Sequence, residues 1–117
     1  MAKYFKESEF TCKCGCGKNN ISQELVTRLD AAREEAGVPF VVTSGCRCEK
    51  RNKEAGGVAG SSHLKGMAVD IATPPARIYF ILKALLNNFN RHGIPCDNNF
   101  VHVGIDPEKP QNVVFKY

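Results

Sequence analysis

The sequence lacks the apolar segments that membrane insertion and secretion require. None of its 117 residues belongs to an apolar run of about 20, the length of a membrane-spanning helix. The first ten residues, MAKYFKESEF, are polar and charged and contain no apolar signal-peptide core. We therefore expect a chain that is cytoplasmic as synthesised and does not insert into a membrane.

The sequence also lacks a strong charge of either sign. It has 16 Lys and Arg against 12 Asp and Glu, a net charge of +4, and the two signs are interleaved. A nucleic-acid-binding surface needs a basic stripe, usually with stacking aromatics, and none is visible. No repeat, linker or low-complexity segment interrupts the chain, so one domain over residues 1–117 is expected.

What remains is a mixture of helical and strand patterns. In residues 21–37, Ser22 is a good N-cap and Gly37 a good helix end, and Thr73 with Pro74 suggests a second such start. The patterns predict helices at 21–37, 47–56 and 73–88, and strands at 38–45, 66–72, 89–95, 99–106 and 112–117. This order predicts an α+β fold, with helices packed on a small, mainly antiparallel sheet.

Histidine is scarce, with three residues in the chain, and two of them occupy suggestive positions. Strand alternation places Asp70 on a face of small residues and His102 beside Gly104. His63 precedes Asp70 by seven positions, about 23 Å if fully extended, so the two meet only if the chain turns. Gly66 allows such a turn. Two histidines and one carboxylate form the ligand set of a catalytic zinc with an open position.

An ordinary structural interpretation exists for each of these residues. His63 would be a loop histidine, Asp70 a buried hydrogen-bond acceptor and His102 a satisfied strand residue. His92, in NRHGI, suits a strand or a sheet edge better than a metal site. Composition and spacing alone favour this interpretation.

Several motifs, however, resemble the M15 zinc peptidases, a family of D-Ala-D-Ala carboxypeptidases and phage L-Ala-D-Glu endolysins with a hedgehog-like fold. The segment SSHLKGMAVD resembles the family signature S-x-H-x-x-G-x-A-x-D. TSGCRC resembles S-G-x-R, FVHV resembles the strand of the last zinc histidine, and FKESEFTCKCGCGKN resembles the opening of small phage or prophage members. The matches run in family order along nearly the whole chain.

The resemblance implies roles for individual residues. His63, Asp70 and His102 would bind one catalytic Zn²⁺, and Arg47 would stabilise an oxyanion or clamp a substrate carboxylate. Many members carry an acidic general base three residues before the last histidine.

In this chain that position is Asn99, whose amide cannot accept a proton, and Gly104 replaces an aspartate expected in small relatives. Asp97 is the first candidate for the base, ahead of Asp106 and Glu108.

Six cysteines leave three alternatives open. CKCGCG places three at alternate positions, and Cys46 and Cys48 follow later. A structural zinc site usually shows C-x-x-C pairs, which are missing here. An additional metal site, a disulfide such as Cys12–Cys48, and reduced thiols in a compact loop all fit the pattern.

Together these features predict a zinc metallopeptidase that hydrolyses an amide of the peptidoglycan stem peptide. Carboxypeptidase and endolysin-type endopeptidase specificities remain open, and a monomer acting on the cell wall after phage-type release is expected. The alternatives are a catalytically impaired zinc-containing module that binds wall peptides or a protein partner, and a structural virion component.

Overall fold

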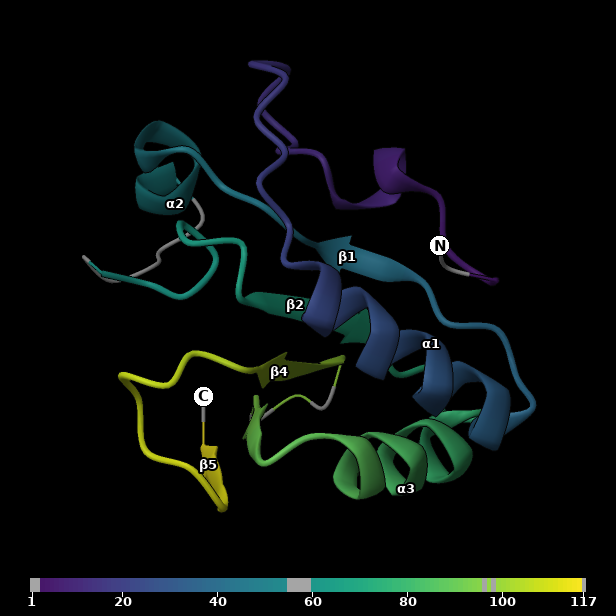
Figure 1. Ribbon diagram of the computed structural model, residues 1–117. Coiled ribbons are helices and arrows are strands. Elements are labelled where there is room, and N and C mark those ends of the chain that lie inside the picture. Colours follow the sequence, from purple (N-terminus) through teal and green to yellow (C-terminus); the bar gives the residue numbers. More distant parts are fainter. Residues whose placement is uncertain (1–2, 55–59, 96, 98, 117) are drawn as a thin grey trace.

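A computed structural model describes residues 3–54, 60–95, 97 and 99–116. A five-stranded sheet in the order β1-β2-β4-β3-β5 forms its centre (Figure 1). The strands are β1 (Val42–Ser44), β2 (Ala68–Ala72), β3 (Arg91–Ile94), β4 (Phe100–Gly104) and β5 (Val113–Lys116). Each neighbouring pair is antiparallel except β3–β5, which is parallel. The predicted α+β class and mainly antiparallel sheet are confirmed.

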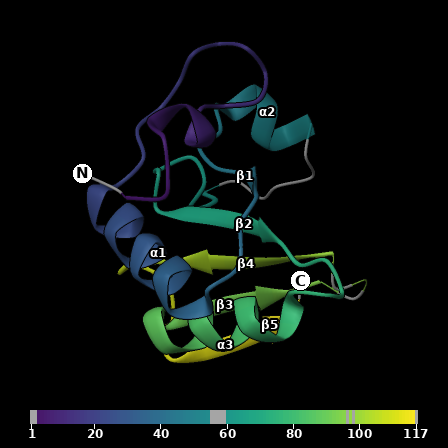
Figure 2. The same cartoon turned by 90° about the vertical axis from the view of Figure 1, so that its right-hand side faces the viewer.

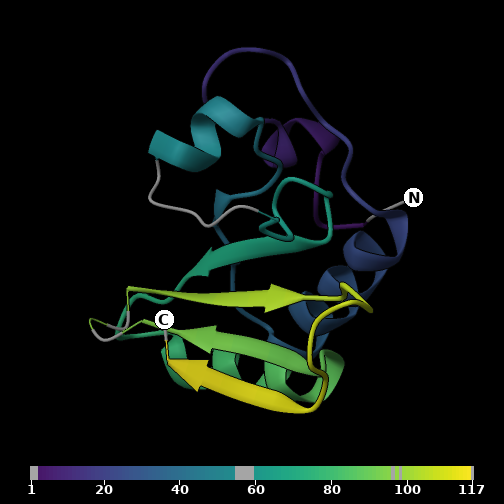
Figure 3. The same cartoon turned by 90° about the vertical axis from the view of Figure 1, so that its left-hand side faces the viewer.

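Two helices cover one face of this sheet. They are α1 (Gln23–Ala36) and α3 (Ile78–Asn88), which pack on each other and lie on the same side of the strands (Figure 2). The short helix α2 (Glu49–Glu54) and the N-terminal segment lie beyond β1, and β5 forms the opposite edge (Figure 3). The face away from α1 and α3 is therefore left for a functional site.

The apolar residues that alternate along β2 and β4 form the core with α1 and α3. Val69 and Ile71 on β2 and Val101 and Val103 on β4 are buried against the helices. The intervening residues point to the other face, as strand alternation requires. The helices contribute Leu25, Leu29, Ala32, Ile81, Ala84 and Leu85.

The predicted ends of α1 are confirmed. Ser22 Oγ accepts a hydrogen bond from the backbone N–H of Leu25 at 3.4 Å, and Gly37 adopts φ +69° at the C-cap. The predicted start of the third helix is wrong. Thr73 donates its backbone N–H to the carbonyl of Asn99 at 3.0 Å, continuing the β2–β4 pairing. A turn therefore separates Thr73 from α3, which begins at Ile78.

Smaller differences concern the other elements. The N-terminal segment, where no helix or strand is predicted, contains a 3₁₀ helix, η1 (Glu7–Phe10). The Glu9 carboxylate there accepts the backbone N–H of Lys6 at 2.7 Å. β1 is shorter than predicted because a bulge shifts its register against β2. The predicted end of the 47–56 helix, at Gly56, lies outside the described residues, as does Cys96.

Candidate metal centre

The central strand pair brings Asp70 and His102 together. β2 and β4 are antiparallel, and Asp70 lies directly opposite His102 in the register. Both side chains point away from α1 and α3, and Nδ1 of His102 lies 2.9 Å from Oδ1 of Asp70. Two residues that are 32 positions apart therefore share one point on the sheet.

A tight loop returns His63 to the same point. Successive turns between Ser61 and Met67 reverse the chain, and Ser61 Oγ accepts the backbone N–H of His63 at 3.3 Å. Gly66 has φ +68°, and a Cβ there would lie 2.0 Å from the carbonyl oxygen of Asn20. The predicted turn at Gly66 is therefore present, and no larger residue fits it. The Ser61 hydroxyl therefore helps to order the loop before His63.

The S-G-x-R segment, residues 44–47, holds His63 in place through two contacts. The Gly45 carbonyl lies 2.7 Å from Nδ1 of His63, and the Arg47 N–H donates to the His63 carbonyl at 3.2 Å. A Cβ at Gly45 would lie 2.8 Å from the Phe10 backbone, so this close approach requires glycine. With Nδ1 donating to a carbonyl, Nε2 of His63 is the unprotonated nitrogen, the form that binds metals.

The three ligand atoms have the spacing of a metal site. Nε2 of His63 lies 3.3 Å from Oδ1 of Asp70, and all three candidate atoms lie within 4.8 Å of one another. Tetrahedral zinc with bonds of about 2.0–2.1 Å requires ligand atoms about 3.3 Å apart. Nε2 of His63 is buried without a hydrogen-bond partner among the described residues. The donor set and this orphaned nitrogen fit zinc.

Electrostatics keep Asp70 ionised. Burial by itself raises its pKa, but the neighbouring His102 and His63 rings outweigh burial and lower the pKa to about 2. Burial lowers the pKa of His102, against the opposing effect of Asp70, and so favours neutral imidazole. An ionised Asp70 beside a neutral His102 is the protonation state that metal binding requires.

Arg47 is buried and ion-pairs with Asp70. One guanidinium nitrogen lies 3.5 Å from Oδ2 of Asp70, while Nε donates to Ser44 Oγ at 3.1 Å and Nη1 to Asn52 Oδ1 at 3.2 Å. Arg47 is therefore not a surface arginine. Asp70 thus presents one oxygen to the histidines and the other to Arg47.

The predicted base Asp97 is not part of the cluster. It is exposed before β4, and its carboxylate accepts the backbone and side-chain N–H groups of Asn99 at 3.1 and 3.0 Å. Asn99 precedes His102 by three residues, about 10 Å along an extended strand. Asp97 and Asn99 therefore mark one end of β4, and the metal ligands lie nearer its middle.

Asp106 is buried and structural in its contacts. Its carboxylate accepts Ser62 Oγ at 3.0 Å, Lys65 Nζ at 3.1 Å and the backbone N–H of Glu108 at 3.0 Å. Burial raises its pKa, but the Glu108 N–H, Lys65 and Ser62 outweigh it and lower the pKa. A solvated loop role is excluded, because Asp106 ties the His63 loop to the end of β4.

An aromatic side chain that the sequence did not predict at the site lies beside His102. On β3, Gly93 pairs with both His102 and Phe115, and the Phe115 ring centre lies 6.0 Å from that of His102. The Arg91 guanidinium carbon lies over the Phe115 ring, 4.5 Å from its centre. The alternation of NVVFKY could have placed Phe115 on one face, but only sheet order places it beside His102. His92 on the same strand bonds to the Leu85 carbonyl at 2.8 Å, as a structural histidine.

Comparison with known proteins places the chain in a family. The family model described as Peptidase M15 matches residues 3–104. The chain therefore belongs to the peptidase M15 family of zinc metallopeptidases, and the resemblance seen in its motifs is confirmed. A search of curated proteins found no match. Among the described residues, no helix is long and apolar enough to cross a membrane.

Proposed function

We propose that the protein is a zinc-dependent peptidase that hydrolyses an amide bond of peptidoglycan stem peptides. The observation that carries the proposal is the convergence of Nε2 of His63, Oδ1 of Asp70 and Nδ1 of His102. Family membership supports the same chemistry. When bound, zinc supplies a Lewis acid that polarises a carbonyl and lowers the pKa of a coordinated water.

Arg47 acts on this site in two ways under the proposal. Its contact with Oδ2 of Asp70 fixes the orientation of that carboxylate, as supporting groups around metal ligands do. A guanidinium carries five N–H donors in a rigid plane, so it can also donate to an oxyanion or a substrate carboxylate. Its burial lowers the screening that would weaken such an interaction in water.

Asp97 is the proposed proton acceptor. The competing carboxylates, Asp106 and Glu108, both ion-pair with Lys65, whereas Asp97 bonds within a two-residue turn. A general base must come within hydrogen-bond reach of the proton it removes, and catalytic contacts often tighten only when substrate binds. The proposal therefore includes a movement of the Asp97 turn toward the metal centre in the substrate complex.

Digestion of purified peptidoglycan by the zinc-loaded protein tests the proposal. Mass spectrometry of the products should show a new species, and its mass identifies a D-Ala-D-Ala, L-Ala-D-Glu or cross-bridge cleavage. His63→Ala is the control, since it removes one metal ligand and should abolish the product. A folded, zinc-bound protein that releases nothing would contradict peptidase activity.

A second candidate function is a zinc-containing module that binds wall peptides without cutting them. The amide of Asn99 at the usual base position, together with the absence of Asp97 from the described cluster, favours this alternative. Muropeptide binding that depends on His63 but yields no product would identify it. Binding and cleavage together would exclude it.

A further inference from the structure

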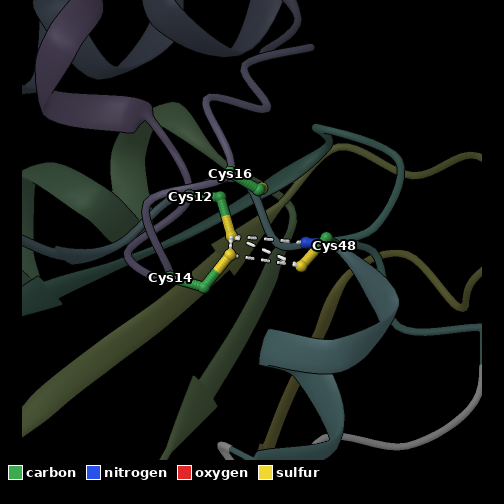
Figure 4. Close-up of side chains that lie close together, drawn as sticks. All are labelled: Cys12, Cys14, Cys16 and Cys48. Carbon is green, nitrogen blue, oxygen red and sulfur yellow. Dashed lines mark hydrogen bonds between the residues drawn. The ribbon is translucent and has the colours of Figure 1, made fainter.

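A second group of side chains that could bind a metal lies between the N-terminal segment and the start of α2. Cys12, Cys14 and Cys16 come from the N-terminal segment and Cys48 from the residue before α2. Their four sulfur atoms lie within 4.8 Å of one another, and Figure 4 shows them gathered between the loop and α2. None of them belongs to the His63 cluster.

Two glycines fold the loop so that alternate cysteines converge. In an extended chain, residues two positions apart lie about 6.6 Å apart on one face. Gly15 and Gly17 adopt φ +86° and +83°, and the Cys12 N–H donates to the Lys18 carbonyl at 2.9 Å. The chain therefore reverses within seven residues, which brings the three thiols to one side of Cys48.

The sulfur spacings distinguish a metal site from a disulfide. Sγ of Cys14 lies 3.5 Å from Sγ of both Cys12 and Cys48, and the Cys12–Cys48 distance is 3.8 Å. Zinc bound to four sulfurs at about 2.3 Å requires sulfur atoms about 3.8 Å apart. A disulfide requires about 2.05 Å. Three thiols at similar separations fit a shared cation better than a bond between two of them.

Backbone N–H groups also point at the sulfurs. The Cys48 N–H donates to Sγ of Cys12 at 3.4 Å, and the Arg51 N–H donates to Sγ of Cys48 at 3.4 Å. Such donors stabilise thiolates, which are the form that binds metal.

We propose that Cys12, Cys14, Cys16 and Cys48 bind one structural zinc ion. Four protein ligands close the coordination sphere, so the ion has no open position for a substrate and serves structure. The missing C-x-x-C pairs do not exclude this site, because its fourth ligand comes from a distant segment. The inference is independent of the peptidase activity proposed above.

The site would hold the segment that supports His63 and Asp70. Gly45 to Cys48 is a continuous stretch in which the Gly45 carbonyl contacts His63 and Arg47 contacts Asp70. The backbone N–H of Cys46 donates to the Phe10 carbonyl at 2.8 Å and so anchors this stretch. Zinc at Cys48 would fix the far end of this stretch to the N-terminal loop.

The test uses the full chain with His63→Ala, so that only the cysteine site can hold zinc tightly. The protein is prepared with reductant. We expect one zinc per chain, with X-ray absorption showing sulfur neighbours at about 2.3 Å. Adding Cys14→Ser or Cys16→Ser, at exposed positions, should reduce bound zinc at least tenfold. Cys46→Ala, a cysteine outside the cluster, is the matched control and should retain the metal.

Thiol reactivity of the wild-type protein gives a second measurement that needs no variant. The exposed Cys14 and Cys16 should react slowly with a thiol reagent when zinc is bound and rapidly after chelation. A folded His63→Ala protein without zinc, zinc with only nitrogen and oxygen neighbours, or equal reactivity before and after chelation would overturn the proposal. Loss of peptidase activity with the sulfur site intact would count against the proposed function alone.

Discussion

At the scale of single residues, Asp70 connects all the charged parts of the candidate metal centre. Its Oδ1 faces His63 and His102, and its Oδ2 faces Arg47. A buried carboxylate with three such partners stays ionised, and its negative charge balances the positive charge of the buried Arg47 guanidinium. Because one carboxylate faces the histidines with one oxygen and Arg47 with the other, the metal site and Arg47 form one electrostatic unit.

Asp97→Asn should lower kcat about 100-fold or more, because general base catalysis contributes roughly 10²–10⁴ in rate. Bound zinc and the unfolding temperature should not change, since Asp97 is exposed and outside the ligand cluster. Steady-state kinetics on a stem-peptide substrate, with metal analysis of the same samples, measures both.

Asp106→Asn is the matched control for this substitution. It weakens a buried acceptor of three donors, so it should cost about 1–3 kcal/mol of stability while retaining the proton-transfer step. If Asp106→Asn abolished turnover in a stable, zinc-bound protein and Asp97→Asn did not, the base would be Asp106.

At the scale of elements, the site depends on short loops and an edge strand more than on helices. The loop between Ser61 and Met67 carries His63 back to β2, and β5 adds Phe115 beyond β3. Neither element has regular structure long enough to form alone. Their conformations follow from close backbone contacts and from sheet pairing.

Gly66→Ala should destabilise the protein by more than about 3 kcal/mol and abolish zinc binding at His63. A left-handed backbone costs an alanine roughly 1–2 kcal/mol, and the new Cβ would also clash with the Asn20 carbonyl at 2.0 Å. Gly60→Ala separates the two effects, because Gly60 has φ +78° but nothing within 4 Å of a Cβ. Urea unfolding of both variants gives the comparison, and equal losses would rule out the clash as the cause.

Phe115→Ala should raise the KM for a stem-peptide substrate about tenfold, as loss of a well-packed aromatic contact of about 1.4 kcal/mol does. Zinc affinity should be unchanged, because Phe115 packs near the ring of His102 but is not one of the three ligand residues of the cluster. Val114→Ala, on the exposed side of the same strand, is the control. An unchanged KM in Phe115→Ala would exclude a substrate-contacting role for β5.

At the scale of the whole molecule, buried ionisable groups make stability depend on pH. The folded-state pKa of His102 lies below its ordinary value, so the unfolded chain binds the proton more readily. Stability should therefore be constant above about pH 6.5 and fall as pH decreases below it. Asp70, with a pKa of about 2 against 3.8, adds stability that is lost as pH falls from 3.8 toward 2.

Urea unfolding of the metal-free protein between pH 8 and pH 3 measures this dependence. Asp70→Asn is informative for two reasons. It removes the loss of stability that protonation of Asp70 causes at low pH, and it removes the carboxylate partner of His102. Stability that rose between pH 7 and pH 5 would contradict a neutral, buried His102.

Much of this architecture could be predicted from the sequence because alternation and glycine positions are local signals. The face shared by Asp70 and His102, and the turn at Gly66, needed only strand periodicity and one backbone constraint. The start of α3 could not be predicted, because pairing of Thr73 with Asn99 outcompeted a local helix cap. Cys48 as a fourth thiol and Phe115 beside His102 depend on long-range packing in the same way.

The pairing of β2 with β4 has a consequence for folding kinetics. Asp70 and His102 are 32 residues apart, so their site forms only after a long loop has closed, a step whose entropic cost precedes any gain. If that closure follows the rate-limiting step, zinc at His63, Asp70 and His102 stabilises the native state but not the transition state. Stopped-flow measurements should then show zinc slowing unfolding while refolding rates stay unchanged. The metal would thus prolong the lifetime of the folded state without accelerating folding.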